Sequence, residues 1–400
     1  MTFSSQRAAA SPLRGVVLSQ TGRSDALADL LFTQLCMASQ NNPKNQRMNM
    51  FPPFSPVALL QRGSLRCLAL LVALGLGAGS HVKGEEGNRM TVKQTFTITN
   101  VPAGAKQIRG WLWMPEDRPG QRVLEFRVTK APENFRITRD PRYGRSWIYV
   151  EAAADPAAPL LVETEFTLVR EKLSGMASSS KTRPLADVDR RSFATELRLD
   201  EKHMEVNLEI QQLAMQIAGN ERNPVTVARR FFNYVIERSE HYSKSGPTPK
   251  GKCLGDAMEC MTGKGDCCTD QHALFIALCR AKGIPCRLIF GSRLKVENEG
   301  KDHDPGYRCW PNFYAPGLGW VPLDVSSGDA AGDKAEDWFG GLDANRAEWA
   351  EGRDFDLEPR SSVRPDLVIR GWVEIDGKPH TGLKRVINFK RQPAGETAAR

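Results

Sequence analysis

Hydrophobic and polar residues alternate along the chain from Thr91 to about Arg170. Runs at 124–128 and 162–168 place mainly apolar side chains at every second position, with Thr, Glu or Arg between them. Turns rich in Pro and Gly, such as 101–104, separate the runs at short intervals. A period of two bounded by such turns predicts antiparallel strands that bury one face. We therefore expect an antiparallel β-sandwich over residues 88–172.

The period becomes helical after a linker at 173–187. Apolar residues recur at three- and four-residue spacing from Val206 to Ile217, and Asn223-Pro224 is a typical start for a second helix. A third run, Ala273 to Leu278, is apolar on every side, and Lys282-Gly283 follows it as a helix end. This composition predicts a helix that is buried all round.

Strand-like runs follow the third helix at 284–290, 307–314 and 320–324, and a last β-rich region spans roughly 367–389. Helices followed by an antiparallel sheet are the order of an α+β fold. The predicted division is a disordered or mis-assigned N-terminal extension at 1–47, a signal-peptide region at 48–83, the sandwich at 88–172, the linker at 173–187, an α+β domain at 188–330 and a β-rich C-terminal extension at 331–400.

The charge of the chain is concentrated in its first part. The 400 residues carry a formal net charge of +8, and residues 1–83 hold eight Lys or Arg against two Asp or Glu, so the remainder has a net charge of only +2. No basic stripe or nucleic-acid-binding motif accompanies that remainder, which makes nucleic acid a poor candidate partner.

A signal peptide explains the basic first part. Arg62 and Arg66 precede the apolar run 67–77, which is too short to span a bilayer comfortably, and small residues follow it. A short buried helix is the alternative interpretation. The late position suggests that translation starts at Met48 or Met50. We expect a secreted or periplasmic mature protein without a membrane anchor.

Seven of the nine cysteines lie in the predicted mature part, and all fall within about 60 residues. An odd number in an oxidising compartment leaves at least one thiol free or intermolecular, so one free nucleophile and up to three disulfides fit the count. A zinc site is disfavoured because no C-x-x-C pair is present, and no acidic calcium loop is found. We expect neither a metal nor a cofactor.

The most informative stretch is Gly265 to Phe275, where the third helix begins. Cys267 and Cys268 stand at the helix start, where unpaired backbone N–H groups lower the pKa of a thiol and favour the nucleophilic thiolate. A catalytic cysteine is one interpretation of this stretch. A buried structural thiol or half of a disulfide is the other.

This stretch resembles the first core motif of the transglutaminase-like superfamily, from Gly265 to Arg287. A second motif matches Cys309-Trp310 and the run from Phe313 to Asp324. The resemblance implies papain-type chemistry on a protein or peptide substrate, as hydrolase or acyltransferase at peptide or amide bonds. It assigns the nucleophile to Cys268 and the acid to Asp324, and makes Cys267 an extra residue after Gly-Asp.

The chain departs from the family at the histidine position, which is occupied by Arg308, and at a glutamate position, which is occupied by Asn312. Arginine cannot exchange protons near neutral pH, although Arg308 could hold a thiolate by charge and pair with Asp324. His303 or His272 could replace the missing base. His272 was expected to point away from the strand that should carry the base.

Two function classes therefore remain open. One is a cysteine enzyme built on Cys268, Arg308 and Asp324, and the other is a non-catalytic descendant that keeps the fold to bind proteins or peptides. Cys309 is expected to face away from the site. The other cysteines are expected in the core (Cys279, Cys286) or in disulfides (Cys253, Cys260, Cys267).

Overall fold

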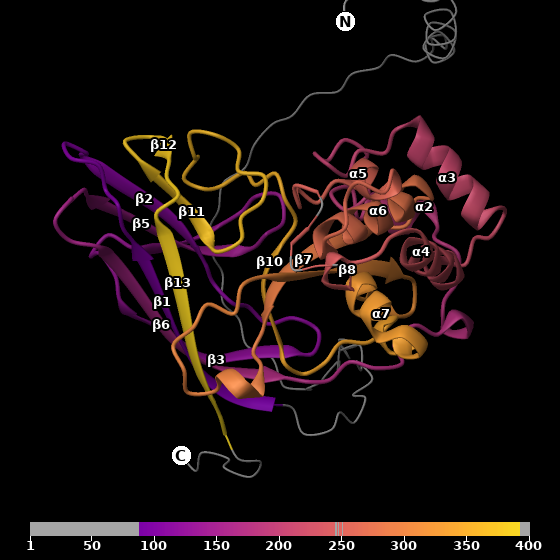
Figure 1. Ribbon diagram of the computed structural model, residues 1–400, viewed down its shortest axis with the longest axis horizontal. Coiled ribbons are helices and arrows are strands. Elements are labelled where there is room, and N and C mark those ends of the chain that lie inside the picture. The colour runs from indigo at the N-terminus through magenta and orange to yellow at the C-terminus, as the bar shows by residue number, and fades with distance from the viewer. Residues whose placement is uncertain (1–87, 245, 247, 250, 393–400) are drawn as a thin grey trace, which may run out of the picture. The chain divides into compact units, whose positions relative to one another are not determined.

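The computed structural model describes residues 88–392 except 245, 247 and 250 (Figure 1). The predicted extension and signal peptide at 1–83 lie outside the described residues. No described helix is long and apolar enough to cross a membrane. The fold class is α+β, as predicted, with antiparallel sheets from the N-terminal part followed by a domain of helices on a third sheet.

Two antiparallel sheets form the β-rich part. From one edge to the other, the strands of the first sheet are β13 (Leu383–Arg391), β1 (Asn88–Ile98), β6 (Leu160–Arg170) and β3 (Gln121–Lys130). The second is β12 (Lys378–Pro379), β11 (Gly371–Ile375), β2 (Gln107–Trp113), β5 (Ser146–Ala153) and β4 (Arg136–Arg139).

Period-two burial explains why these segments form sheets. In β1 the residues at 90, 92, 94, 96 and 98 are buried, whereas their neighbours are partly or fully exposed. Trp111, Trp113 and Trp147 are fully buried in the second sheet, and the last two stack with ring centroids 4.1 Å apart. Each such side chain contributes about 1.5–3 kcal/mol or more of burial free energy, which stabilises the packing of these sheets.

The segment predicted as a C-terminal extension supplies strands to both parts of the fold. β13 pairs with β1 from Met90↔Arg391 to Ile98↔Leu383, and β11 pairs with β2. β10 (Arg346–Glu351) instead pairs with β7 (Cys286–Arg293), a strand of a third sheet. The β-rich part is thus closed by strands from the opposite end of the described chain.

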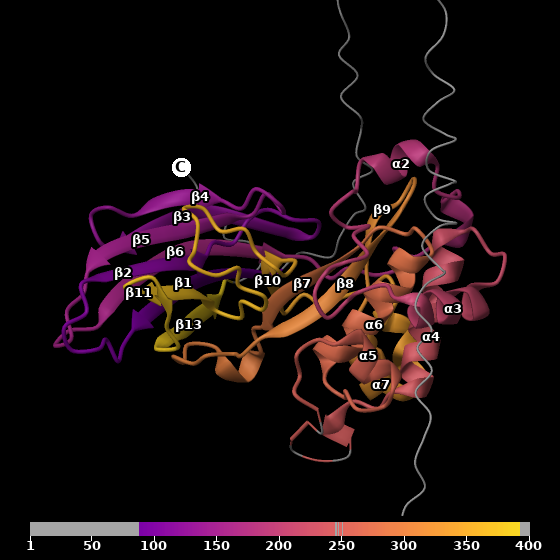
Figure 2. The same ribbon diagram turned by 90° about the horizontal axis from the view of Figure 1, so that it is seen from above.

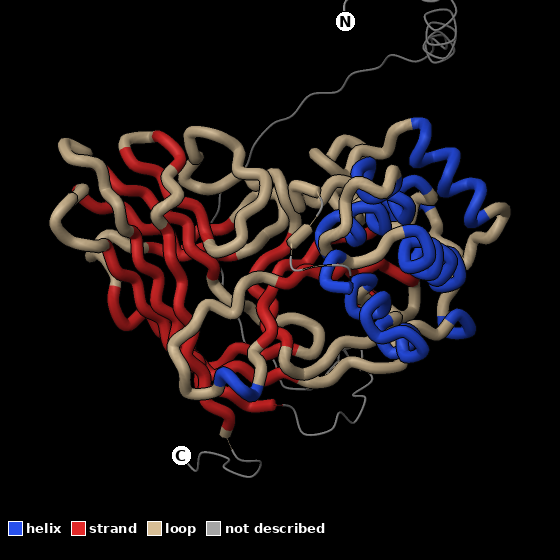
Figure 3. The backbone as a smooth tube through the Cα atoms, viewed as in Figure 1, coloured by secondary structure: helices blue, strands red, loops and turns tan. Residues whose placement is uncertain are grey.

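The third sheet has the order β10, β7 (Cys286–Arg293), β8 (Arg308–Ala315) and β9 (Gly319–Pro322). The helices beside it are α3 (Leu208–Ala218), α4 (Pro224–Arg238), α5 (Ala257–Met261), α6 (Cys268–Ala281) and α7 (Val325–Ala331) (Figures 2 and 3). Shorter helical segments are η1 (Ser179–Lys181), α2 (Asp187–Arg191), η2 (Tyr242–Lys244), η3 (Val296–Asn298) and η4 (Gly332–Trp338).

Helix α6 lies at the centre of this domain. It packs against α3, α4, α5, α7, β7 and β8, and every residue from Cys268 to Arg280 is buried. The helix ends at Ala281, one residue before the predicted Lys282-Gly283 stop, and Gly283 has a φ of +68°. The prediction of a helix buried all round is confirmed, and its first residue is Cys268.

The disulfides that the cysteine count allowed are not formed among the described residues. All seven described cysteines are free thiols, and Cys279 and Cys286 lie in the core as expected. Cys253 and Cys267 are hydrogen-bonded neighbours rather than a bridge.

Candidate active site

The loop before α6 is fixed by the buried carboxylate of Asp270, in the first turn of the helix. Its Oδ1 accepts hydrogen bonds from the backbone N–H groups of Gly255 (2.9 Å) and Asp256 (3.0 Å), and its Oδ2 accepts from Cys267 (3.4 Å). Cys267 is the N-cap residue. This capping places the next residue, Cys268, in the first helical position, where the first backbone N–H groups of a helix lack intrahelical acceptors.

The Cys268 side chain opens onto a small cavity of about 210 Å³. Its sulfur lies 3.7 Å from the sulfur of Cys309 on β8 and 3.9 Å from Thr269 Oγ1. The residue is 7% exposed. A small ligand group can therefore reach the thiol, although most of the side chain is enclosed.

Several donors and positive charges hold the pKa of Cys268 well below its ordinary value. The largest cause is the hydrogen bond from the Cys309 thiol, and it acts against burial, which by itself would raise the pKa. A hydrogen bond from His241 and the charges of His272 and Arg308 lower the pKa further. Cys268 is therefore the described cysteine whose pKa is lowered, and it is the one to which the family resemblance assigned the nucleophile.

A buried chain of polar groups extends from Cys309 to Asp324. His272 Nδ1 lies 3.2 Å from Cys309 Sγ. The other ring nitrogen, Nε2, accepts the backbone N–H of Val325 at 3.1 Å and lies 3.3 Å from Asp324 Oδ1. His272 therefore links Cys309 to Asp324, and the Cys309 thiol donates to the Cys268 sulfur.

Two predictions about this chain were wrong. Cys309 faces α6 rather than away from it, because the buried side of β8 at this register is the side that contacts the helix. His272 is one turn after Cys268 on the same helix face, and this face is directed at β8 and at Asp324, not away from them. The i, i+4 spacing of Cys268 and His272 already indicated that the two side chains share one face of the helix.

Asp324 lies at the site but pairs with a different arginine from the one considered. Its Oδ2 is 2.6 Å from Arg346 Nη1, and both side chains are almost fully buried. Burial would raise the pKa of Asp324, but the Arg346 charge and the His272 hydrogen bond outweigh it and hold the pKa well below its usual value. The suggested Arg308–Asp324 pair is not formed, because Arg346 of β10 occupies that position.

Arg308 is the first residue of β8 and is exposed at the mouth of the small cavity. Within the described part of the chain its side chain makes one long hydrogen bond, of 3.5 Å, to the Tyr307 carbonyl oxygen. Its charge contributes to the lowered pKa of Cys268. Arg308 can thus hold the thiolate by charge, as anticipated, but it supplies no proton.

His241 is a site residue that sequence analysis missed. It follows α4, lines the cavity with Cys268, and helps to lower the pKa of the Cys268 thiol. Its backbone N–H donates to Asp329 Oδ2 on α7 (2.8 Å), and the next residue, Tyr242, donates its N–H to the Asp266 carbonyl oxygen (2.9 Å). No local motif marks His241, because these tertiary hydrogen bonds place it.

Ser243 contacts the His241 ring in a way that suits both protonation states. Nδ1 lies 2.8 Å from Ser243 Oγ and 3.3 Å from the Ser243 backbone nitrogen. The neutral ring can accept the backbone N–H, and the imidazolium can donate to the hydroxyl oxygen. The other ring nitrogen has no protein partner among these contacts, and the ring lines the same cavity as Cys268.

His303, the second histidine considered as a replacement base, lies elsewhere. Its backbone pairs with Ile387 of β13, and its Nδ1 lies 3.3 Å from the Lys301 carbonyl oxygen. It is absent from the lining of the cavity that holds Cys268. The loop 295–305 therefore does not bring its histidine to the thiol.

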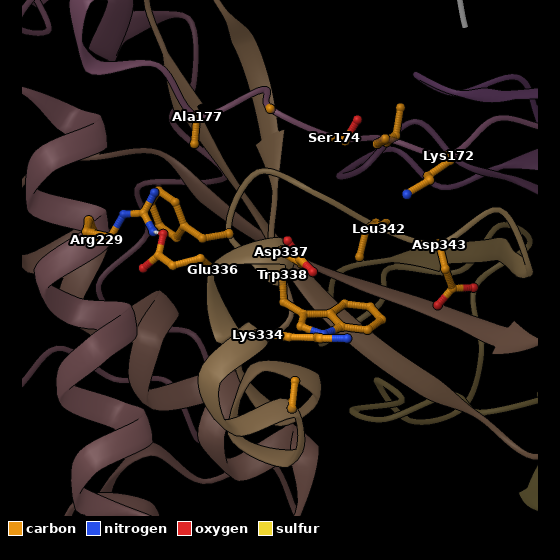
Figure 4. Close-up of a pocket in the computed structure, with 14 residues that line it drawn as sticks. Lys172, Ser174, Ala177, Arg229, Lys334, Glu336, Asp337, Trp338, Leu342 and Asp343 are labelled. Atoms are coloured by element: carbon orange, nitrogen blue, oxygen red, sulfur yellow. Dashed lines mark hydrogen bonds and ion pairs between the residues drawn. The ribbon is translucent and has the colours of Figure 1, made fainter. Parts of the chain in front are cut away.

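A larger cavity of about 570 Å³ lies beside the linker and η4 (Figure 4). Trp338 and Lys334 project into it, and Arg229 pairs with Glu336 at its edge. Its lining contains no cysteine or histidine. Asp343 lines this cavity and pairs with Arg293 and Arg346, which line the smaller one.

One group of side chains has a possible metal-binding composition. The ligand atoms of Cys253, Cys267 and Asp270 lie within 4.8 Å of one another. Burial raises the pKa of the Cys253 thiol to about 11 and that of Cys267 further, which disfavours the thiolates that a metal needs. The Asp270 oxygens already cap three backbone N–H groups. The group fits a structural role better than a metal site.

The arrangement can perform nucleophilic acyl chemistry. Cys268 supplies a thiolate, and the N–H groups of the first turn of α6 are available to an oxyanion. His241 has an imidazole at the cavity and can exchange a proton with a substrate, whereas His272 is 0% exposed and cannot.

Comparison with known proteins agrees with this geometry. The family model of the transglutaminase-like superfamily core matches residues 211–325. An uncharacterized protein of Haemophilus influenzae is 26% identical over 343 residues, which are 75% of this chain and 90% of the relative.

One solved structure supports the fold, and a second shows a weaker similarity. The crystal structure of a candidate cysteine protease from Cytophaga hutchinsonii has a TM-score of 0.53 at 15% identity, covering 78% of this chain and 93% of that one. The periplasmic domain of TgpA from Pseudomonas aeruginosa has a TM-score of 0.31 at 14% identity, with 63% and 91% covered. The similarity of this chain to the transglutaminase-like superfamily therefore lies in the core domain at residues 211–325.

Proposed function

We propose that the chain is an exported cysteine hydrolase or acyltransferase that acts at peptide or amide bonds. One observation carries the proposal. The Cys268 thiol stands at the start of a buried helix, its pKa is held well below the ordinary value, and it shares a cavity with an imidazole, that of His241. A thiol kept only for packing has no need of such donors.

The reaction follows from the two side chains. The Cys268 thiolate attacks the carbonyl carbon, and the oxygen that becomes negative faces the backbone N–H groups at the start of α6. When the C–N bond breaks, the nitrogen takes a proton from the His241 imidazolium and leaves as an amine. A thioester remains on Cys268. Water then attacks it for hydrolysis, or an amine attacks it for transfer, and His241 removes the proton of that nucleophile.

The buried residues position and tune the nucleophile. Cys309 donates to the thiolate, His272 orients Cys309, and Asp324 with Arg346 holds His272 in place. In this arrangement the imidazole on α6 replaces part of the electrostatic role of the family histidine. The proton-exchange role passes to His241, because only this ring contacts the cavity.

Export is part of the proposal and rests on the apolar run 67–77 with its flanking basic and small residues. Expression of the full chain in a bacterium followed by N-terminal sequencing of the exported form tests it. We expect an N-terminus shortly after residue 77. A mature protein that begins before residue 60 would contradict export through this segment.

The activity is tested with two measurements on the full chain. The first is alkylation of Cys268 by iodoacetamide as a function of pH, followed by peptide mass spectrometry, with Cys279 of the same helix as an internal buried control. The second is turnover of a fluorogenic peptide library, with and without an added amine.

We expect fast alkylation of Cys268 at a pH where Cys279 is inert, because burial raises the pKa of Cys279 well above the ordinary value. We also expect turnover that is lost in Cys268→Ala and reduced at least 100-fold, on the order of a lost general acid–base, in His241→Gln. Full turnover in His241→Gln would contradict the assigned role.

A non-catalytic binding module is the second candidate, and Arg308 at the family's histidine position favours it. In that case the natural chain would turn over no peptide, Cys268→Ala would bind peptides as the natural chain does, and Arg308→His would be the variant in which hydrolysis or amine incorporation first appears. Turnover by the natural chain excludes this candidate.

A further inference from the structure

We infer that the site selects acyl substrates that carry a carboxylate next to the bond under attack, such as an acidic side chain or a free C-terminus. This inference rests on the proposed function and names its substrate class. It comes from the composition of the cavity around Cys268, which three arginines line and no Asp or Glu lines.

The three arginines differ in how far their charges are already neutralised. Arg346 is buried and pairs with Asp324 and Asp343. Arg293 is 38% exposed and makes one contact, of 3.3 Å, with the shared Asp343. Lys244 nearby is paired with Asp329 at 2.6 Å. Arg308 has no ion pair with any carboxylate of the described residues, so its charge is available to a ligand.

In the free protein the charge of Arg308 acts on the Cys268 thiolate. The thiolate loses its negative charge when its sulfur bonds to the carbonyl carbon. A substrate carboxylate beside Arg308 then replaces the thiolate as the counter-charge. An anionic substrate therefore gains attraction as the reaction proceeds, whereas a neutral substrate leaves the arginine without a partner.

The geometry of arginine and the size of the cavity support the same substrate class. A guanidinium presents a planar fork of donors that matches a carboxylate in two parallel hydrogen bonds. Ligand pockets for whole small molecules are usually about 300–1,000 Å³, and this cavity has about 210 Å³. It suits one side chain or one chain end of a peptide that otherwise lies outside.

A charge-selective labelling experiment tests the inference on the full chain. The alkylation rates of Cys268 are measured with iodoacetate, which is anionic, and with iodoacetamide, its neutral counterpart. The ratio of the two rates is compared among the natural chain, Arg308→Gln and Arg308→Lys. Arg122→Gln, which removes an exposed arginine from β3, is the control for net charge.

We expect the ratio of iodoacetate to iodoacetamide rates to fall roughly fivefold or more in Arg308→Gln, as removal of a nearby unit charge predicts. Arg308→Lys and the Arg122→Gln control should keep it, and added salt should weaken the selectivity of the natural chain. An unchanged ratio in Arg308→Gln overturns the inference.

A binding measurement separates this inference from the proposed activity. A series of short blocked peptides is prepared in which a single glutamate occupies a different position in each peptide. These peptides and their glutamine counterparts are titrated into the full-chain variant Cys268→Ala. We expect at least one glutamate peptide to bind roughly fivefold tighter than its counterpart, a difference lost when Arg308→Gln is added. Equal binding at every position overturns the inference, even if the natural chain is active. Selective binding without turnover overturns the proposed function alone.

Discussion

Substitution of Cys309 by alanine is the sharpest test of the chain of groups behind the nucleophile. The Cys309 thiol lies 3.7 Å from the Cys268 sulfur, and its hydrogen bond is the largest cause of the lowered Cys268 pKa. Cys309→Ala removes this donor and leaves His241 and Arg308 in place. We therefore expect the Cys268 pKa to rise and less thiolate to be present at any pH below it.

The size of the effect follows from the strength of the lost bond. A hydrogen bond to a charged group contributes about 1.5–3 kcal/mol. A thiol is a weak donor, so the lower end applies, about 1.5 kcal/mol, which is a factor of about ten in the thiol–thiolate equilibrium. The cost in folding stability should be small, about 1 kcal/mol, because only one buried sulfur atom is lost.

The assay is the rate of iodoacetamide alkylation of Cys268 across the acidic to neutral range, with the mass of the labelled peptide as readout. Cys309→Ser is the matched control, since its hydroxyl keeps a donor at the same place. The alanine variant should be about tenfold slower below the pKa, and the serine variant should remain close to the natural chain. Equal rates in the natural chain and the alanine variant would refute the proposal that Cys309 lowers the Cys268 pKa.

Two further predictions concern stability, both measured by urea unfolding. Arg346→Met leaves the buried carboxylate of Asp324 without its counter-charge and should cost about 3–5 kcal/mol. Because the folded-state pKa of Asp324 is depressed, the stability that it contributes is present above its unfolded value, near 3.9, and is lost as the pH falls. Asp324→Asn should therefore flatten the acid side of the stability profile, and an unchanged slope would contradict the assigned pairing. Gly352→Ala places a Cβ about 2.1 Å from the Tyr143 ring at a φ of +86° and should cost about 2–5 kcal/mol. Gly104→Ala, with a φ of +79° and open space around it, should show only the conformational part, about 1–2 kcal/mol, and equal losses at the two glycines would disprove the steric argument.

The elements that sequence predicts well are those with a local cause. Helix α6 was predicted because its apolar run and its Lys282-Gly283 end are local signals. The helix start drew attention to the Cys267–Cys268 doublet, and the family motif selected Cys268 from it. The strands of the sandwich follow from period-two burial. Asp324 was predicted at the site because the run from Phe313 to Asp324 matches a specific motif of the family.

The elements that sequence did not predict are set by contacts between distant segments. Alternation along a strand indicates that Arg308 and Cys309 face opposite sides, but not which side meets α6. Arg346 reaches Asp324 only because β10 pairs with β7, and His241 reaches Cys268 only because Asp329 and the turn before α6 hold its loop. No property of the local sequence encodes these meetings.

The pairing of the last strands with the first has a consequence for synthesis. On a ribosome, β1 and β2 emerge long before β11 and β13, which lie roughly 260 to 300 residues later and complete both sheets. Until then β1 and β2 are unprotected sheet edges, which are templates for aggregation. A premature stop codon anywhere between β10 and β13 would spare every residue assigned to catalysis, yet we expect it to yield an insoluble product. The defect would therefore be a lower amount of soluble protein and not a lower catalytic rate per molecule.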